Sequence, residues 1–185
     1  MLFFTESFQS LGTAIKARKA LQRLVDAGEL EQVAIGIYVG SIIDTVIGKV
    51  STSIEAIAKP IARRNRASIA PTGVYALNRL GLSTEVPLKV VFLTNGTPGK
   101  IKVGNTSITF KKTTTKNVEA VGEISRLAIQ ALRTIGKEQV TPDEIKKIQH
   151  LLLKEKKTKL EYDIRLAPVW IREIMKPVLK ANPNE

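Results

Sequence analysis

The chain has 185 residues, no cysteine, 43% hydrophobic residues and a formal net charge of +12 at pH 7. This length and hydrophobic content allow one ordinary domain or two small ones with a packed core, which excludes wholesale disorder. The lack of cysteine excludes disulfides, thiolate metal sites and cysteine nucleophiles, while the basic balance points to an anionic partner, most often nucleic acid.

The apolar N-terminus and the most apolar internal stretch indicate neither a signal peptide nor a membrane span. No basic residue flanks the apolar segment Met1–Phe4, which is followed by Thr5 and Glu6. The apolar stretch over residues 33–50 is interrupted by glycines and charged residues, so it is unsuited to a bilayer. We therefore expect a cytoplasmic protein without a membrane partner.

Residues 13–27 have the spacing of an amphipathic helix, which Gly28 ends. Small and apolar side chains fall on one arc of this helix, namely Thr13, Ala17, Ala20, Leu21 and Leu24. Basic side chains fall on the opposite arc, namely Lys16, Lys19 and Arg23. Taken by itself, the helix is explained by a solvated amphipathic face.

Two short apolar strands over residues 30–34 and 37–39 follow the helix, with Gly36 at the bend between them. A helix, a glycine stop and a tight hairpin form the end of a winged helix-turn-helix, in which the helix reads DNA and the hairpin is the wing. We therefore predict an α+β fold that begins with a winged helix over residues 1–42. The predicted DNA contacts are Thr13, Lys16, Arg18, Lys19 and Arg23.

The net charge is concentrated in the second part of the chain. Residues 1–50 contain five basic and five acidic residues, whereas the remainder contains 24 basic and 12 acidic residues. If DNA is the partner, we expect the second domain, predicted over residues 50–180, to supply much of the attraction to phosphates.

The second domain is predicted to begin with a helix after a connector over residues 40–51. Thr52 and Glu55 have the spacing of a capping box, and Pro60 strains the helix that follows. Three arginines lie near its end, Arg63, Arg64 and Arg66. Favourable placement at a helix C-terminus and phosphate contact explain them equally well.

A short helix from Pro71 to Gly81 and then a small antiparallel sheet are predicted next. The apolar run 90–93 is typical of a strand covered on both faces. Residues 100–103 and 107–111 alternate around Gly104-Asn105, which predicts a hairpin with an outer face lined by lysine and threonine. The predicted phosphate contacts of the second domain are Arg63, Arg64, Arg66, Lys111 and Lys112.

The rest of the chain is predicted to be helical. Residues 118–135 keep helical spacing up to Gly136, and Thr141 with Glu144 forms a second capping box before a helix that runs to Leu152. The last helix opens at Pro168, and the only tryptophan, Trp170, is interpreted as a core anchor.

The sequence provides no constellation that supports catalysis. His150 is the only histidine, and we interpret it as a satisfied or partly buried helix residue, which with the lack of cysteine argues against zinc. Gly40-Ser41 could open a nucleotidyltransferase motif, but residues 51–56 provide only Glu55 where two carboxylates must hold metal ions. We therefore expect a non-enzyme with no catalytic residue, metal or cofactor.

Several segments resemble AbiEi-type antitoxins. The N-terminal domain of that family is similar to Phe4–Phe8 and to the helix and hairpin residues 19–24, 28–30 and 36–38. The following antitoxin domain is similar to the run 75–87, which continues to 92–96. Residues 130–137 and 167–170 extend the similarity toward the C-terminus.

The resemblance implies the antitoxin of a type IV toxin–antitoxin pair, linked to abortive infection of phage-infected bacteria. It implies that a winged helix binds operator DNA and represses its own operon. It also implies that the C-terminal region counters a nucleotidyltransferase-like toxin, with direct binding left open. Relatives carry a further helix before the Phe-Thr segment, so we expect the winged helix here to lack its first helix. Their wing usually has arginine near the positions of Glu31, Gln32 and Ile35.

Two other functions stay open. The first is that of a basic protein that binds RNA, or DNA without sequence specificity, and has no antitoxin role. This hypothesis rests on charge alone, and the few aromatic residues argue against base stacking. A nucleotidyltransferase-like enzyme is disfavoured by the missing carboxylate pair.

Overall fold

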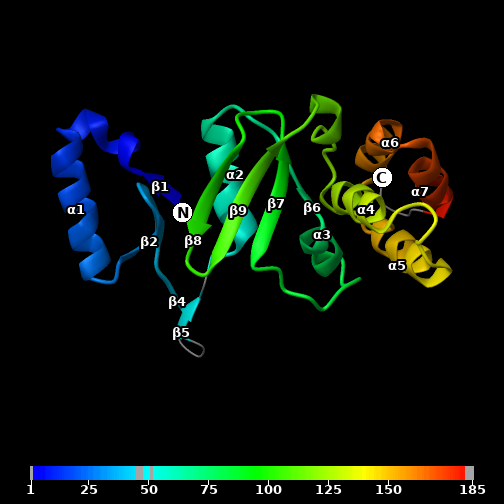
Figure 1. Ribbon diagram of the computed structural model, residues 1–185, viewed down its shortest axis with the longest axis horizontal. Helices are drawn as coiled ribbons and strands as arrows, with labels where there is room; N and C mark the ends of the chain where they lie inside the picture. Colours follow the sequence, from blue (N-terminus) through cyan, green and yellow to red (C-terminus); the bar gives the residue numbers. More distant parts are fainter. Residues whose placement is uncertain (1, 45–47, 51, 182–185) are drawn as a thin grey trace. The chain divides into compact units, whose positions relative to one another are not determined.

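The computed structural model describes residues 2–44, 48–50 and 52–181 (Figure 1). It is a mixed α+β structure that forms two compact units. The first unit comprises Met1–Ile61 with Ile101–Ile108, and the second comprises Ala62–Lys100 with Thr109–Glu185. These units are defined by packing, so the independent domains over residues 1–42 and 50–180 stay a prediction.

The first unit begins with a three-stranded sheet, in which a 3₁₀ helix and an α-helix connect the first strand to the hairpin formed by the other two. The elements are β1 (Leu2–Phe4), the 3₁₀ helix η1 (Thr5–Leu11), α1 (Ala14–Asp26), β2 (Leu30–Ala34) and β3 (Ile37–Gly40). β3 pairs antiparallel with both neighbours, which gives the order β1-β3-β2. The predicted helix and both predicted strands are confirmed, and Gly28 (φ 76°) and Gly36 (φ 71°) adopt the conformation that glycine favours.

Three further elements follow in the N-terminal part of the chain. The antiparallel strands β4 (Ile42–Asp44) and β5 (Gly48–Val50) lie where the sequence predicts only a connector, so that interpretation is wrong. α2 (Ile54–Arg64) follows with Pro60 inside it, as predicted. The hydroxyl of Ser53 accepts a hydrogen bond from the Ala56 amide (3.2 Å), so Ser53 rather than Thr52 caps the helix.

A four-stranded sheet follows in the chain. Its strands are β6 (Ile69–Thr72), β7 (Lys89–Thr94), β8 (Gly99–Val103) and β9 (Thr106–Lys112), in the order β6-β7-β9-β8, with α3 (Val74–Arg79) between β6 and β7. The segment Ile101–Ile108 within β8 and β9 is counted with the first unit. Pro71 lies in β6 and not at the start of a helix, which corrects the prediction. An edge strand accommodates proline because the backbone amides on its outward side form no hydrogen bond with a neighbouring strand. β7 has one buried and one half-buried face, so it is not fully covered on both sides as predicted.

Helices form the C-terminal part of the second unit. They are the 3₁₀ helix η2 (Thr115–Asn117), α4 (Glu123–Ile135), α5 (Pro142–Leu152), α6 (Lys157–Leu166) and α7 (Val169–Ala181). The Thr141–Glu144 capping box is confirmed. Trp170 packs half-buried against the helical core, as predicted, whereas His150 is exposed, which corrects its interpretation as a partly buried residue. No helix in the described ranges is long and apolar enough to cross a bilayer.

The start of α4 is fixed by two buried carboxylates from distant parts of the chain. Asp163 on α6 accepts hydrogen bonds from the amides of Val121 and Gly122, both at 2.8 Å, and from the Ser125 hydroxyl. Glu155 accepts from the amide of Ile124 at 2.8 Å. These acceptors satisfy the free amides of the first helical turn, so α4 begins at Glu123 and not near Val118 as the periodicity predicts.

Candidate nucleic-acid interface

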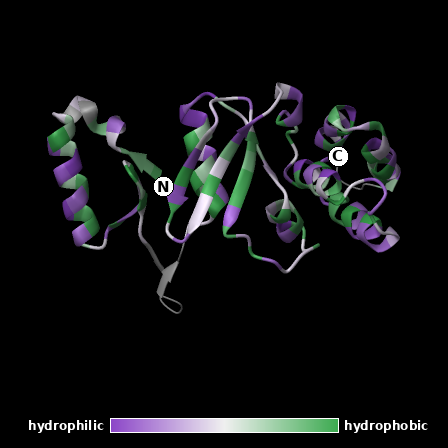
Figure 2. Cartoon of the chain, viewed as in Figure 1, coloured by the Kyte–Doolittle hydropathy of each residue, from purple (hydrophilic) through white to green (hydrophobic). Residues whose placement is uncertain are grey.

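α1 presents basic side chains to solvent in the first unit. Arg18, Lys19 and Arg23 are exposed. Figure 2 shows that α1 carries both hydrophilic and hydrophobic residues along its length. The Thr13 hydroxyl caps the helix by accepting from the Lys16 amide (3.4 Å), so one of its lone pairs is already engaged. Three of the five predicted DNA contacts are therefore available without rearrangement.

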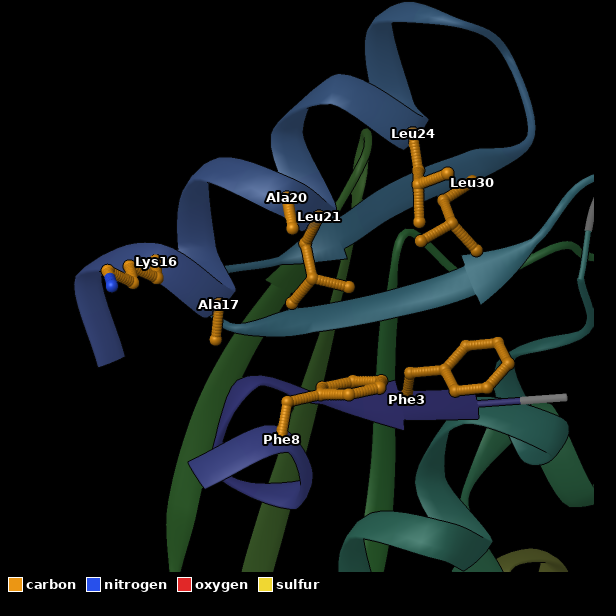
Figure 3. A pocket seen from close by; sticks show the side chains of 8 residues that line it. All are labelled: Phe3, Phe8, Lys16, Ala17, Ala20, Leu21, Leu24 and Leu30. Atoms are coloured by element: carbon orange, nitrogen blue, oxygen red, sulfur yellow. The ribbon is translucent and has the colours of Figure 1, made fainter. Parts of the chain in front are cut away.

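Lys16 lies elsewhere than predicted. Its side chain lines an apolar pocket of about 410 Å³, beside Ala17 and Ala20, instead of lying opposite the apolar arc (Figure 3). The helical angle explains the difference, because Lys16 is only one step around the helix from Ala20. The other lining residues are Phe3, Phe8, Leu21, Leu24 and Leu30. The inner side of α1 is therefore apolar and open.

In the second unit, three segments that are distant in sequence meet at one edge of the sheet. The amide of Ser68 donates to the Asn95 side chain (2.8 Å), which joins the segment after α2 to the turn after β7. The amide of Thr113 donates to the Thr94 carbonyl (2.8 Å), so the ends of β7 and β9 lie at this same edge. Residues 62–68, 94–97 and 109–117 contain no acidic residue.

We call the basic residues on these segments the basic edge: Arg63, Arg64, Arg66, Lys111, Lys112 and Lys116. All six are exposed. The structure therefore brings the five predicted phosphate contacts onto neighbouring segments, and it adds Lys116, which the sequence analysis did not select. The Lys112 ammonium donates to the carbonyls of Asn95 (2.7 Å) and Gly96 (3.1 Å), which leaves one of its three donors for a ligand.

Arg66 holds a conformation that is unfavourable for its residue type. It has φ 50°, the one positive φ at a non-glycine position among the described residues. The amide of Arg66 donates to the Arg63 carbonyl and that of Ala67 to the Ala62 carbonyl, both at 2.9 Å. This is a Schellman ending of α2, in which glycine is the usual residue at the position of Arg66. Strain retained at an exposed arginine favours a role in binding over a role in stability.

Replacing Arg66 by glycine is expected to raise the free energy of unfolding by about 1 kcal/mol, because glycine adopts this conformation without steric cost. Binding of DNA should weaken at the same time, because a charge of the basic edge is lost. Arg66→Gln is the matched control, since it removes the charge and keeps the strain. Urea denaturation and a DNA-binding titration measure the two effects, and equal stability of both variants would contradict the interpretation.

The sequence analysis missed a cationic side chain beside the basic edge. Arg133, in the last turn of α4, donates to the side-chain oxygen of Asn117 (2.7 Å), and Asn117 in turn donates to the Thr113 hydroxyl (2.8 Å). Partial burial lowers the pKa of Arg133 below that of a free guanidinium. A contact across 16 residues has no local sequence signal, so only the tertiary structure finds it.

The exposed cations of both units are suited to binding anions. In the part of the chain that the structure describes, no group of three or more histidine, cysteine, aspartate or glutamate residues is placed to hold a metal ion. Exposed guanidinium and ammonium groups on the outer side of α1 and on the basic edge match the phosphates of a nucleic acid.

Comparison with known proteins gives a family but no activity. No curated protein matches the sequence. A crystal structure of the RV2827C protein from Mycobacterium tuberculosis is similar over 100% of this chain and 78% of that one, with 12% identity and a TM-score of 0.45. Residues 1–160 match DUF6088, a family of unknown function, and the chain belongs to that family.

Proposed function

We propose that the chain is a winged-helix DNA-binding protein that represses its own operon and acts as the antitoxin of a type IV toxin–antitoxin pair. The observation that carries the DNA-binding part is the β1-η1-α1-β2-β3 order with the sheet order β1-β3-β2. In this arrangement a strand precedes the helix and pairs with the second strand of the hairpin, as expected of a winged helix. α1 is then the recognition helix, and the β2–β3 hairpin is the wing.

The exposed surfaces of these elements support the assignment. Arg18, Lys19 and Arg23 provide cations on the outer side of α1, where a recognition helix meets phosphates and base edges. Ile35, at the tip of the hairpin, is 97% exposed. This exposure supports an apolar contact between the wing and a groove of DNA. Glu31 lies in β2 and opposes phosphate binding, so the wing contributes shape more than charge.

The basic edge supplies the electrostatic part of binding. The first 50 residues have no net charge, so their affinity for a polyanion is weak without help. Six cations on segments without an acidic residue add to the phosphate attraction of the cations on α1. Base reading then comes from α1, and much of the affinity comes from the second unit.

The antitoxin part of the proposal rests on the sequence resemblance. The run with the most specific similarity, residues 75–87, extends from α3 into the connection to β7, with Val86 79% exposed. Co-expression tests this part: the chain is expected to restore growth of cells that express the nucleotidyltransferase-like toxin of the same operon. Continued growth arrest would overturn the antitoxin role and leave the DNA-binding role unaffected.

A salt series tests the DNA-binding part. The purified protein is titrated with its own upstream DNA and with a scrambled duplex of equal length at increasing salt concentrations. We expect the upstream DNA to bind more tightly, by about 10³-fold or more when base contacts operate, with the preference kept at moderate salt. Absence of binding to either duplex would overturn the proposal.

A second candidate function is non-specific nucleic-acid binding without an antitoxin role, and the concentration of charge after residue 50 favours it. In the same titration it predicts equal affinity for both duplexes and steep loss of both with salt. That outcome would exclude operator reading by α1.

A further inference from the structure

We propose that Arg133, held by Asn117, directly contacts a phosphate of the bound nucleic acid, as a further binding residue at the basic edge. This inference rests on the proposed DNA binding. It adds a residue from α4 that the charge pattern does not select. The resemblance covers this residue without giving it a role. The interface then extends from the end of the sheet to the end of this helix.

The first step in the argument is the missing counter-ion. Arg133 is half-buried, and within the described ranges its one polar partner is the neutral side-chain oxygen of Asn117. Burying part of a cation is unfavourable unless an opposite charge or several acceptors compensate. Arg79 and Arg165, by contrast, lie beside carboxylates at 3.9 Å and 3.4 Å. Arg133 therefore has no carboxylate counter-ion among the described residues, which leaves room for an anionic ligand.

The second step is that donors of Arg133 remain available. A guanidinium carries five N–H groups, and one nitrogen of Arg133 is engaged with Asn117. Among the described residues, Arg133 has no fully buried side-chain nitrogen that lacks a hydrogen-bond partner, whereas Nε of Arg172 is such a nitrogen. Its remaining donors therefore reach solvent and can form the bidentate pair that a guanidinium makes with phosphate.

The third step is the position of the group. Asn117 is held from two sides, because Gln130 donates to its carbonyl (3.3 Å) and its own amide donates to the Thr113 hydroxyl (2.8 Å). Thr113 follows directly on Lys112 and is bonded to Thr94, so Arg133 lies next to the basic edge. Gln130 is buried, which fixes this network and keeps the guanidinium oriented before the ligand arrives.

The decisive test is Asn117→Asp, which places a carboxylate beside the guanidinium with little change in shape. If Arg133 only supports the fold, this ion pair leaves DNA affinity unchanged and adds stability. If Arg133 contacts phosphate, the new carboxylate competes with the ligand. We then expect about a five-fold loss of affinity for duplex DNA at about 0.15 M salt and a decrease of about 0.9 in the slope of log K against log salt.

Two variants control for charge and fold. Gln139→Glu adds the same negative charge at an exposed position after α4 and is expected to leave the slope unchanged. Arg133→Gln should reproduce the loss seen with Asn117→Asp, and Arg133→Lys should restore most of the slope. If Asn117→Asp and Arg133→Gln both bind DNA as tightly as the wild type and with the same slope, this inference is overturned and the proposed function is unaffected. No DNA binding by the wild type would overturn the proposed function, and this inference with it.

Discussion

Replacing Asp163 by alanine is expected to lower the free energy of unfolding of the second unit by about 3 to 5 kcal/mol. Asp163 is fully buried and accepts three hydrogen bonds, from the amides of Val121 and Gly122 and from the Ser125 hydroxyl. Each buried donor that loses its acceptor costs roughly 1–3 kcal/mol, and hydrogen bonds to a charged acceptor are at the upper end of the scale. Glu155 cannot replace it, because it serves the amides of Ile124 and Ser125.

Urea denaturation followed by circular dichroism measures this loss. Glu161→Gln is the matched control, because Glu161 lies on the same helix, is exposed and forms an ion pair with Arg165 one turn away. Such exposed pairs contribute little, so the control should change stability by less than about 0.5 kcal/mol. A decrease of similar size in both variants would show that the carboxylate does not fix the start of α4.

Replacing Lys19 and Arg23 together by glutamine is expected to reduce the affinity for upstream DNA about 30-fold at about 0.15 M salt. The reason is that the loss of each phosphate contact lowers the binding constant between five- and six-fold, roughly. The slope of log K against log salt should fall by about two. Both side chains are exposed on α1, so neither change removes packing. The stability of the first unit should therefore stay unchanged.

The matched control is the pair Lys176→Gln and Lys180→Gln on α7, which removes the same charge from an exposed helix outside both proposed surfaces. Only the small effect of net charge is expected there. Equal losses in the two double variants would mean that α1 attracts DNA through overall charge and does not lie against it.

Local signals predicted the elements whose ends depend on neighbouring residues. The α5 start follows from Thr141 and Glu144, which are three residues apart, and the α1 end follows from Gly28. The α4 start was mispredicted because its acceptor Asp163 lies about 40 residues further along the chain. Pro71 was misassigned because a strand edge and a first helical turn both tolerate a missing amide.

The same distinction applies to the candidate site. The charges on the helix over residues 14–26 could be selected from the sequence, since helical spacing decides which side chains share a face. The sequence does not show that Lys112 lies near the segment around Arg66. The turn at Asn95 and Gly96 brings them together, because it is hydrogen-bonded to Ser68 in that segment and to the Lys112 ammonium. Arg133 lies in the run 130–137 that carries part of the resemblance, but nothing in the sequence gives it a binding role. Its contact with Asn117 becomes visible only when the neighbours are in place.

The two outer strands of the four-stranded sheet have a consequence for behaviour at high concentration. β6 carries Pro71, which has no amide hydrogen, and it is packed against α4. β8, at the opposite edge, carries exposed lysines at positions 100 and 102. Proline, a covering helix and edge lysines each prevent a strand of another molecule from extending the hydrogen-bonded ladder. The sheet is therefore protected at both outer edges against edge-to-edge pairing with another molecule, which should keep the protein from aggregating at high concentration.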